Sequence, residues 1–91
     1  SRMQEKDLIY TQHALAQNGR ALRLEYYRLT QPDAHGPQYG AAIRCLSADG
    51  EDYAAVPAIT VCPGRIERLL ALLSEHTVTP VTLRDVITDL L

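Results

Sequence analysis

Apolar and polar residues alternate along most of the chain and change to a helical spacing near its C-terminal end. The alternating stretches are residues 8–15, 20–30, 38–47 and 51–59. Because successive side chains of a β-strand point to opposite faces, these stretches predict strands. Asn18-Gly19 follows the first stretch and predicts a type I′ hairpin turn, since both residue types accept a positive φ.

Proline and glycine mark the other breaks between the predicted strands. Residues 31–37 contain two prolines, which cannot donate to a strand ladder, and Asp49-Gly50 predicts a second turn. Leu29 interrupts the alternation of its strand and indicates a bulge or a strand end that is buried on both faces. Pro57 restricts the last strand to an edge or a bulge. In that strand two pairs compete for the core, Tyr53 with Ala55 and Ala54 with Val56.

The C-terminal part predicts two helices, each with one apolar face. In the first, the i, i+3, i+4, i+7 spacing is met by Ile66, Leu69, Leu70 and Leu73. We expect Thr60 to cap this helix, Pro63 to lie near its first turn, and residues 75–77 to end it. Thr82 with Asp85 resembles a capping box for the second helix. Its apolar stripe consists of Leu83, Val86, Ile87 and Leu90.

Strands followed by helices predict an α+β fold, with an antiparallel sheet of three to four strands and two C-terminal helices packed on one face. The chain of 91 residues is expected to form a single domain, 1–91, which is too short for a two-domain enzyme. Neither helix is long enough to be stable alone, so the sheet must hold both. We expect residues 1–7 to be flexible, and we interpret Ser1-Arg2 as a remnant of expression cloning ahead of Met3.

Composition indicates a thin core. Apolar residues make up 46% of the chain, too many for a disordered protein, but 11 of them are alanine and none is Phe or Trp. Leu, Ile and Val together number 23, and five tyrosines supply the aromatic bulk. Nine basic and eleven acidic residues give a net charge of −2, which removes any broad electrostatic argument for binding nucleic acid or an anionic membrane.

Cysteine content and the absence of targeting motifs favour a cytoplasmic protein. Cys45 and Cys62 are fewer cysteines than small secreted domains use, so two reduced thiols are expected. The longest leucine-rich run, residues 69–73, cannot cross a bilayer, which takes about 20 residues. The three histidines are scattered, and no phosphate-binding loop, nucleophile elbow or dinucleotide motif occurs. The sequence therefore predicts no metal and no cofactor, and it gives no specific reason to propose an enzyme.

Cys62 is the strongest candidate for a reactive nucleophile in this sequence. It lies just before the predicted helix, where backbone amides and the helix dipole favour a thiolate. With Tyr39 and one of His13, His35 and His76 nearby in space, it would form a small-molecule or thiol-based catalytic site. The simpler interpretation is a small apolar residue filling a corner, because cysteine is among the most buried residue types. We favour the second.

The sheet face turned away from the helices is the candidate interaction surface. Its middle strand carries small apolar residues, and a contiguous apolar patch usually marks an interface. The interface candidates are Tyr27, Gly40, Ala42 and Leu46. The alternative is that the N-terminal strand or the second helix covers this face.

Arg23, Arg44 and Tyr27 could share the same face as a stacking platform for single-stranded nucleic acid. Glu25 lies between Arg23 and Tyr27, however, and cross-strand ion pairing explains the arginines without a ligand. Nucleic-acid binding is therefore the least favoured of the functions considered.

Several short stretches give the chain a family resemblance. They are Tyr26-Tyr27-Arg28-Leu29, Tyr39-Gly40 and Leu83-Arg84-Asp85-Val86-Ile87. Over residues 22–91 the sequence resembles a family of small bacterial proteins known only as a domain of unknown function, and it departs from that pattern at Ala42 and at Cys62-Pro63-Gly64. The resemblance implies a fold and brings no catalytic residues. We expect a non-enzymatic module whose partner is another protein or a second copy of the chain.

Overall fold

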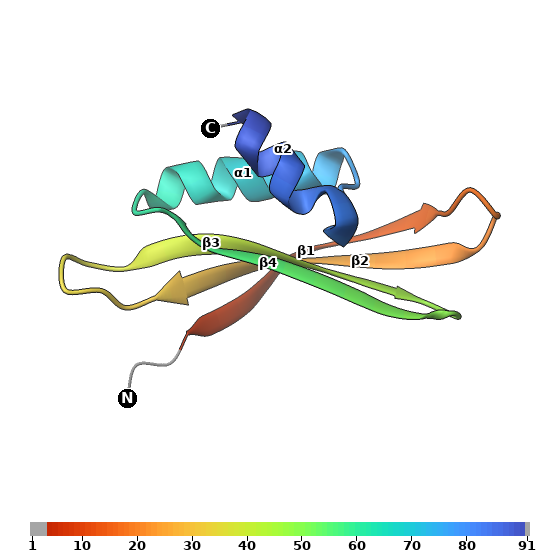
Figure 1. Ribbon diagram of the computed structural model, residues 1–91, viewed down its shortest axis with the longest axis horizontal. Helices are drawn as coiled ribbons and strands as arrows, with labels where there is room; N and C mark the ends of the chain where they lie inside the picture. The colour runs from red at the N-terminus through yellow and green to blue at the C-terminus, as the bar shows by residue number, and fades with distance from the viewer. Residues whose placement is uncertain (1–3, 91) are drawn as a thin grey trace.

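The alternating stretches form one four-stranded sheet, and the helically spaced residues form two helices that pack against it (Figure 1). The computed structural model describes residues 4–90. The elements in chain order are β1 Glu5–Leu15, β2 Ala21–Gln31, β3 Gln38–Ser47, β4 Gly50–Thr60, α1 Pro63–Glu75, the 3-10 turn η1 Pro80–Thr82 and α2 Leu83–Leu90. The sheet is an antiparallel meander in the order β1-β2-β3-β4. The predicted α+β fold is thus confirmed, with four strands. Residues 5–7, which we expected to be flexible, belong to β1, which begins at Glu5. The same expectation for residues 1–3, and the interpretation of Ser1-Arg2, lie outside the described residues.

The turn between β1 and β2 differs from the one predicted. Gly19 has a φ of +79°, whereas Asn18 is not in the positive region, so a type I′ turn is wrong here. The amide of Gly19 donates to the carbonyl of Ala16, and the Asn18 side chain accepts from the amide of Arg20. The Asn18 side chain therefore caps the turn, and only the glycine takes up the left-handed conformation.

The structure settles which face of β4 is buried. Ala54 and Val56 pack against the core, whereas Tyr53 points to the other face and is half exposed. As predicted, Pro57 lies in an edge strand next to an irregularity, where the register between β3 and β4 shifts. Ala58 has a φ of +55° at the same place.

The helix-facing core is built on small residues of the sheet and leucines of the helices. Tyr26 is the largest side chain buried completely, and its hydroxyl donates to the carbonyl of Val78 over 2.9 Å. Burial raises the pKa of Tyr26 to about 12, so the hydroxyl stays protonated to a higher pH than that of an exposed tyrosine. The remaining buried members of this core are Leu24, Ala41, Ile43, Ile66, Leu69, Leu70, Leu73, Val78, Leu83 and Ile87.

Both helix starts differ in detail from the predicted caps. Cys62, not Thr60, is the N-cap of α1, and it makes no side-chain capping bond. The Thr60 hydroxyl instead accepts from the amide of Cys62, one step ahead of the helix. Thr82 belongs to η1, and its hydroxyl lies 3.4 Å from the Thr79 carbonyl instead of capping α2. Pro80 begins a 3-10 turn that leads directly into α2, and Thr82 is the last residue of that turn. Thr82 therefore does not lie in the extended conformation of an N-cap residue.

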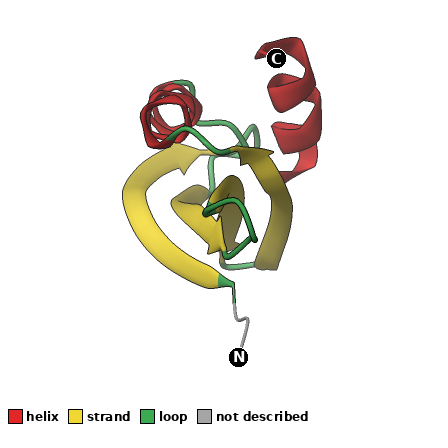
Figure 2. Ribbon diagram, turned by 90° about the vertical axis from the view of Figure 1, so that its left-hand side faces the viewer, coloured by secondary structure: helices red, strands yellow, loops and turns green. Residues whose placement is uncertain are grey.

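The sheet is strongly curved, with both helices outside the curve (Figure 2). The uncovered face is therefore concave, and side chains on it bury one another. Leu29 and Ala42 point to this face and are nonetheless buried. The break in alternation at Leu29 thus marks a part of β2 that is buried on both sides, the second of the two predicted possibilities.

Gly40 provides a test of how closely β3 and β4 approach each other. A Cβ at this position would collide with the Val56 carbonyl and lie 2.7 Å from the Cα of Pro57. We expect Gly40→Ala to lower the free energy of unfolding by about 2 kcal/mol or more, because backbone cannot move aside cheaply. Gly64→Ala is the matched control, since its Cβ would meet only the Cys62 sulfur at 3.9 Å. That variant should stay within about 1 kcal/mol of the parent, and urea unfolding of both checks the difference.

Tyr26→Phe tests the buried hydroxyl. Its loss leaves the Val78 carbonyl without its partner, and we expect a destabilisation of about 1–2 kcal/mol in urea unfolding. Tyr53→Phe is the control, because this half-exposed tyrosine lies outside the core. Equal effects of the two substitutions would contradict a special role for Tyr26.

Candidate functional site

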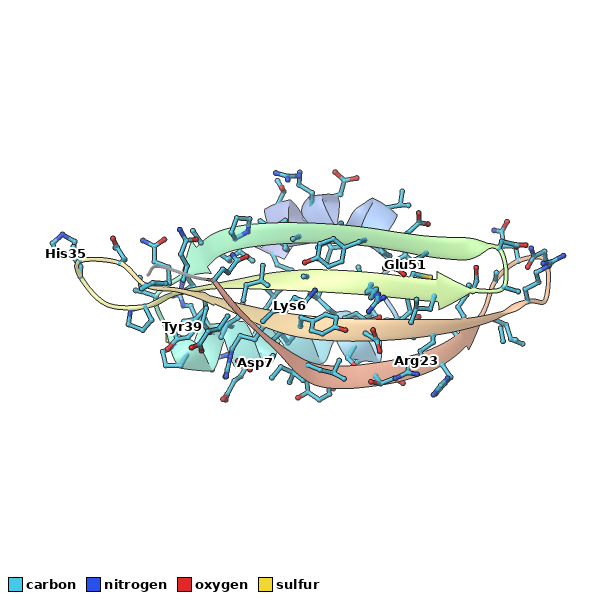
Figure 3. The ribbon with its side chains drawn as sticks, turned by 90° about the horizontal axis from the view of Figure 1, so that it is seen from below. Lys6, Asp7, Arg23, His35, Tyr39 and Glu51 are labelled. Carbon is cyan, nitrogen blue, oxygen red and sulfur yellow. The ribbon has the colours of Figure 1, made fainter. Side chains whose placement is uncertain are left out.

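The concave face holds a lysine between two tyrosine rings. Lys6 reaches from β1 over the middle of the sheet (Figure 3), and its Nζ lies 4.7 Å from the ring centre of Tyr27 and 4.8 Å from that of Tyr53. Both distances fall in the range of cation–π attraction. In the register of the sheet, Ala42 lies opposite Tyr27 and next to Ala55. Small side chains at these positions leave space above β3 for the lysine and the two rings.

A network of ion pairs lies beside this lysine. Glu25 is 6% exposed, and its carboxylate lies 3.1 Å from Arg23 and 3.7 Å from Arg44. It also accepts a hydrogen bond of 2.8 Å from the Tyr27 hydroxyl. Burial, followed by this hydrogen bond to a carboxylate, raises the pKa of Tyr27. The buried carboxylate is therefore partnered on several sides.

Arg44 connects this network to the rim of the sheet. Its guanidinium donates to both carboxylate oxygens of Glu51, at 2.8 and 3.1 Å. The hydrogen bond from Arg44 lowers the pKa of Glu51, and the same bond raises that of Arg44. Because the pair is exposed to solvent, it contributes little to the stability of the fold. We infer that its main effect is to orient the Arg44 side chain.

The four predicted interface residues do share the concave face, but they are not equally accessible. Gly40 and Ala42 are buried, and Tyr27 and Leu46 are half-buried. The small apolar residues thus form a floor that Lys6 and the tyrosines cover, instead of an open patch. The role of these residues in an interface stays a prediction.

Arg23, Arg44 and Tyr27 also come together on this face, as the stacking-platform hypothesis requires. Glu25 lies at their centre and pairs with both arginines. The Glu25 carboxylate accepts the guanidinium groups that a phosphate would otherwise bind. This is the ion pairing that the sequence pattern indicated.

Cys62 is exposed at the start of α1. The nearby backbone amides of Arg65 and then Gly64, at the start of the helix, lower the pKa of its thiol, and the charges of Arg65 and Arg68 act in the same direction. None of the groups that shift this pKa is a histidine. His76 is the C-cap at the far end of α1, and His35 projects from the tip of the loop between β2 and β3 (Figure 3). The favoured interpretation of Cys62 as a buried corner residue is therefore wrong, because the thiol is exposed. A reactive role of this thiol stays a prediction.

Sequence reasoning missed two surfaces. One is the free edge of β1, where Leu8, Ile9 and Tyr10 are 48%, 37% and 39% exposed. The other is a groove of about 400 Å³ between α1, α2 and the end of β4. It is lined by Ile59, Thr60, Arg65, Arg68, Leu69, Leu72 and Leu90. Leu72 and Leu90 are the residues from which the groove could have been predicted, because both lie at the margins of the apolar stripes of their helices.

Among residues 4–90, no group of three His, Cys, Asp or Glu side chains is placed to hold a metal ion. Within the same range, no helix has the length and apolar character needed to span a membrane.

Comparison with known proteins gives one result. The sequence model described as "Family of unknown function (DUF6514)" matches residues 5–91. Neither the curated proteins nor the solved structures contain a match to the chain.

The two cysteines provide a test of the local electrostatics. The pKa of Cys62 is lowered, whereas burial, followed by the charge of Asp52, raises that of Cys45. Since the thiolate is the nucleophile, iodoacetamide at pH 7 should label Cys62 well before Cys45. Mass spectrometry of partly labelled protein checks the order. Arg65→Gln should slow the labelling of Cys62, and Arg84→Gln on α2 should leave it unchanged; a faster reaction at Cys45 would contradict the assignment.

Proposed function

The chain belongs to the DUF6514 family, a family of unknown function, and we propose from its surfaces that it is a self-association module that dimerises through the edge strand β1. The observation that carries this proposal is an 11-residue edge strand with three consecutive exposed apolar residues, Leu8, Ile9 and Tyr10. An unpaired strand edge offers a row of amides and carbonyls to another strand, and exposed apolar side chains add affinity.

A bulge shapes this edge. The register between β1 and β2 shifts between Leu8 and Tyr10, and a bulge turns neighbouring side chains toward the same face. Ile9 and Tyr10 accordingly both line a small hollow between β1 and α1, together with Arg28, Glu67 and Leu70. The Nε atom of Arg28 is buried and has no hydrogen-bond partner among the described residues. The hollow thus combines apolar side chains with an arginine that has one unsatisfied buried donor, and buried donors in folded proteins are normally paired.

The opposite edge of the sheet is unsuited to pairing. Pro57 in β4 lacks a donor, and Ala58 has a left-handed φ of +55°. Such interruptions protect an edge from strand addition. With a single usable edge, two copies close a two-fold dimer, and a growing fibre is excluded.

Charge favours an antiparallel arrangement of the two β1 strands. The acids of the strand, Glu5 and Asp7, lie in its first half, whereas His13 lies near its end. Antiparallel pairing places the first half of one strand opposite the second half of the other. The carboxylates of the two copies are thereby kept apart.

Sedimentation equilibrium over a wide range of concentrations tests the dimer. We expect a reversible dimer, and Ile9→Lys should weaken the association at least tenfold, which is about 1.4 kcal/mol, because it places a charge in the apolar contact. Val81→Lys is the control, since Val81 is 81% exposed and lies in η1. It should leave the association unchanged.

A monomer at all concentrations would overturn the proposal, and so would equal weakening by the two lysine substitutions. Amide hydrogen exchange gives a second measurement: protection of β1 should rise with protein concentration. Protection that does not depend on concentration would speak against pairing at this edge.

A further inference from the structure

The groove between α1, α2 and the end of β4 combines an apolar floor with one charged margin. Four of its lining residues are Ile59, Leu69, Leu72 and Leu90. Leu72 is 39% exposed and Leu90 is 50% exposed, in spite of their size. Val61, next to the groove in sequence, is 66% exposed. Large apolar side chains clustered in this way indicate a contact surface.

The charged margin is positive only. Arg65 and Arg68 line the groove and lie three residues apart on α1, so they share one side of the helix. No carboxylate among residues 4–90 lies within ion-pair distance of either one, whereas Arg20, Arg23, Arg28 and Arg44 are each paired. The first turn of α1 also contains no acidic residue, so the positive end of the helix dipole adds to the two charges. In a chain of net charge −2, this is a local positive field beside leucines.

We propose that this groove binds an acidic amphipathic helix of a partner protein. The leucines would receive the apolar face of that helix, and Arg65 and Arg68 would pair with its carboxylates. Charge complementarity selects the sign of the partner. The open shape of the groove favours a helix over a small apolar molecule. A small molecule needs a cavity that encloses most of its surface, whereas a groove between helices accepts one face of another helix.

This site is independent of the dimer edge. The residues of α1 that face the groove include Arg65, Arg68 and Leu72, whereas Glu67 and Leu70 line the hollow beside β1. Two sides of the same helix therefore serve two surfaces. A dimer formed through β1 would leave both grooves accessible, and a monomer would still possess its own.

A designed peptide provides the probe. It has about four helical turns, leucine at positions i, i+3, i+4 and i+7, and glutamate at most other positions; a matched peptide carries lysine in place of every glutamate. Titration of isotope-labelled full-length protein, followed by amide chemical shifts, should show binding of the acidic peptide with shifts confined to α1, α2 and the end of β4. The lysine peptide should bind at least tenfold more weakly.

Charge reversal at the groove completes the test. Arg65→Glu combined with Arg68→Glu should weaken binding of the acidic peptide at least tenfold. The variant should still fold, because both side chains are exposed and an acid at position 65 is favourable in the first turn of the helix. Arg84→Glu is the matched control on α2, outside the groove lining, and should bind as the parent does. The proposal is overturned if both peptides bind equally, if Arg84→Glu weakens binding as much as the double variant, or if dodecanoate binds the groove and displaces the peptide.

Discussion

The hydrogen-bonded burial of Tyr26 is the constraint on which the helical layer depends. The helix-facing side of the sheet is paved with small residues such as Ala41 and Ala54, so one large side chain must fill the space below the helices. Tyr26 does so, and its hydroxyl needs a buried acceptor, because an unsatisfied hydroxyl in the core is costly. The acceptor is the carbonyl of Val78, in the link that leads from α1 into η1 and α2. The direction in which the chain leaves α1 is thus tied to the middle of β2.

Curvature of the sheet follows from the same shortage of bulk. A flat sheet with helices on one side only would leave its second face in water, yet Ala42 and Leu29 on that face are buried. The sheet bends around them, and Lys6 crosses over to lie between Tyr27 and Tyr53. The concave face thereby becomes a second, smaller cluster of aromatic and ion-paired groups. This explains why small apolar residues on this strand do not form an open patch.

The surfaces left for partners lie at the margins of the two layers. Within residues 4–90, β1 is an edge strand of the meander, and the groove lies where α2 leaves Leu72 of α1 partly exposed. One is apolar and offers backbone groups, whereas the other is apolar and positive. The partners that we propose therefore differ, a second copy of the chain at the edge and an acidic helix in the groove.

The sequence by itself determined the elements and their order, since alternation and helical spacing reflect local backbone geometry. It also indicated the edge position of Pro57 and the pairing of Glu25 with arginines, each of which depends on near neighbours. The buried position favoured for Cys62 is wrong, because the residue is exposed. Only the tertiary structure decided which face of β4 is buried, how far the sheet bends and where Lys6 lies. Those outcomes depend on contacts such as Tyr26 with Val78, 52 residues apart. Periodicity cannot encode such contacts, because it records which side of an element is apolar and not what covers it.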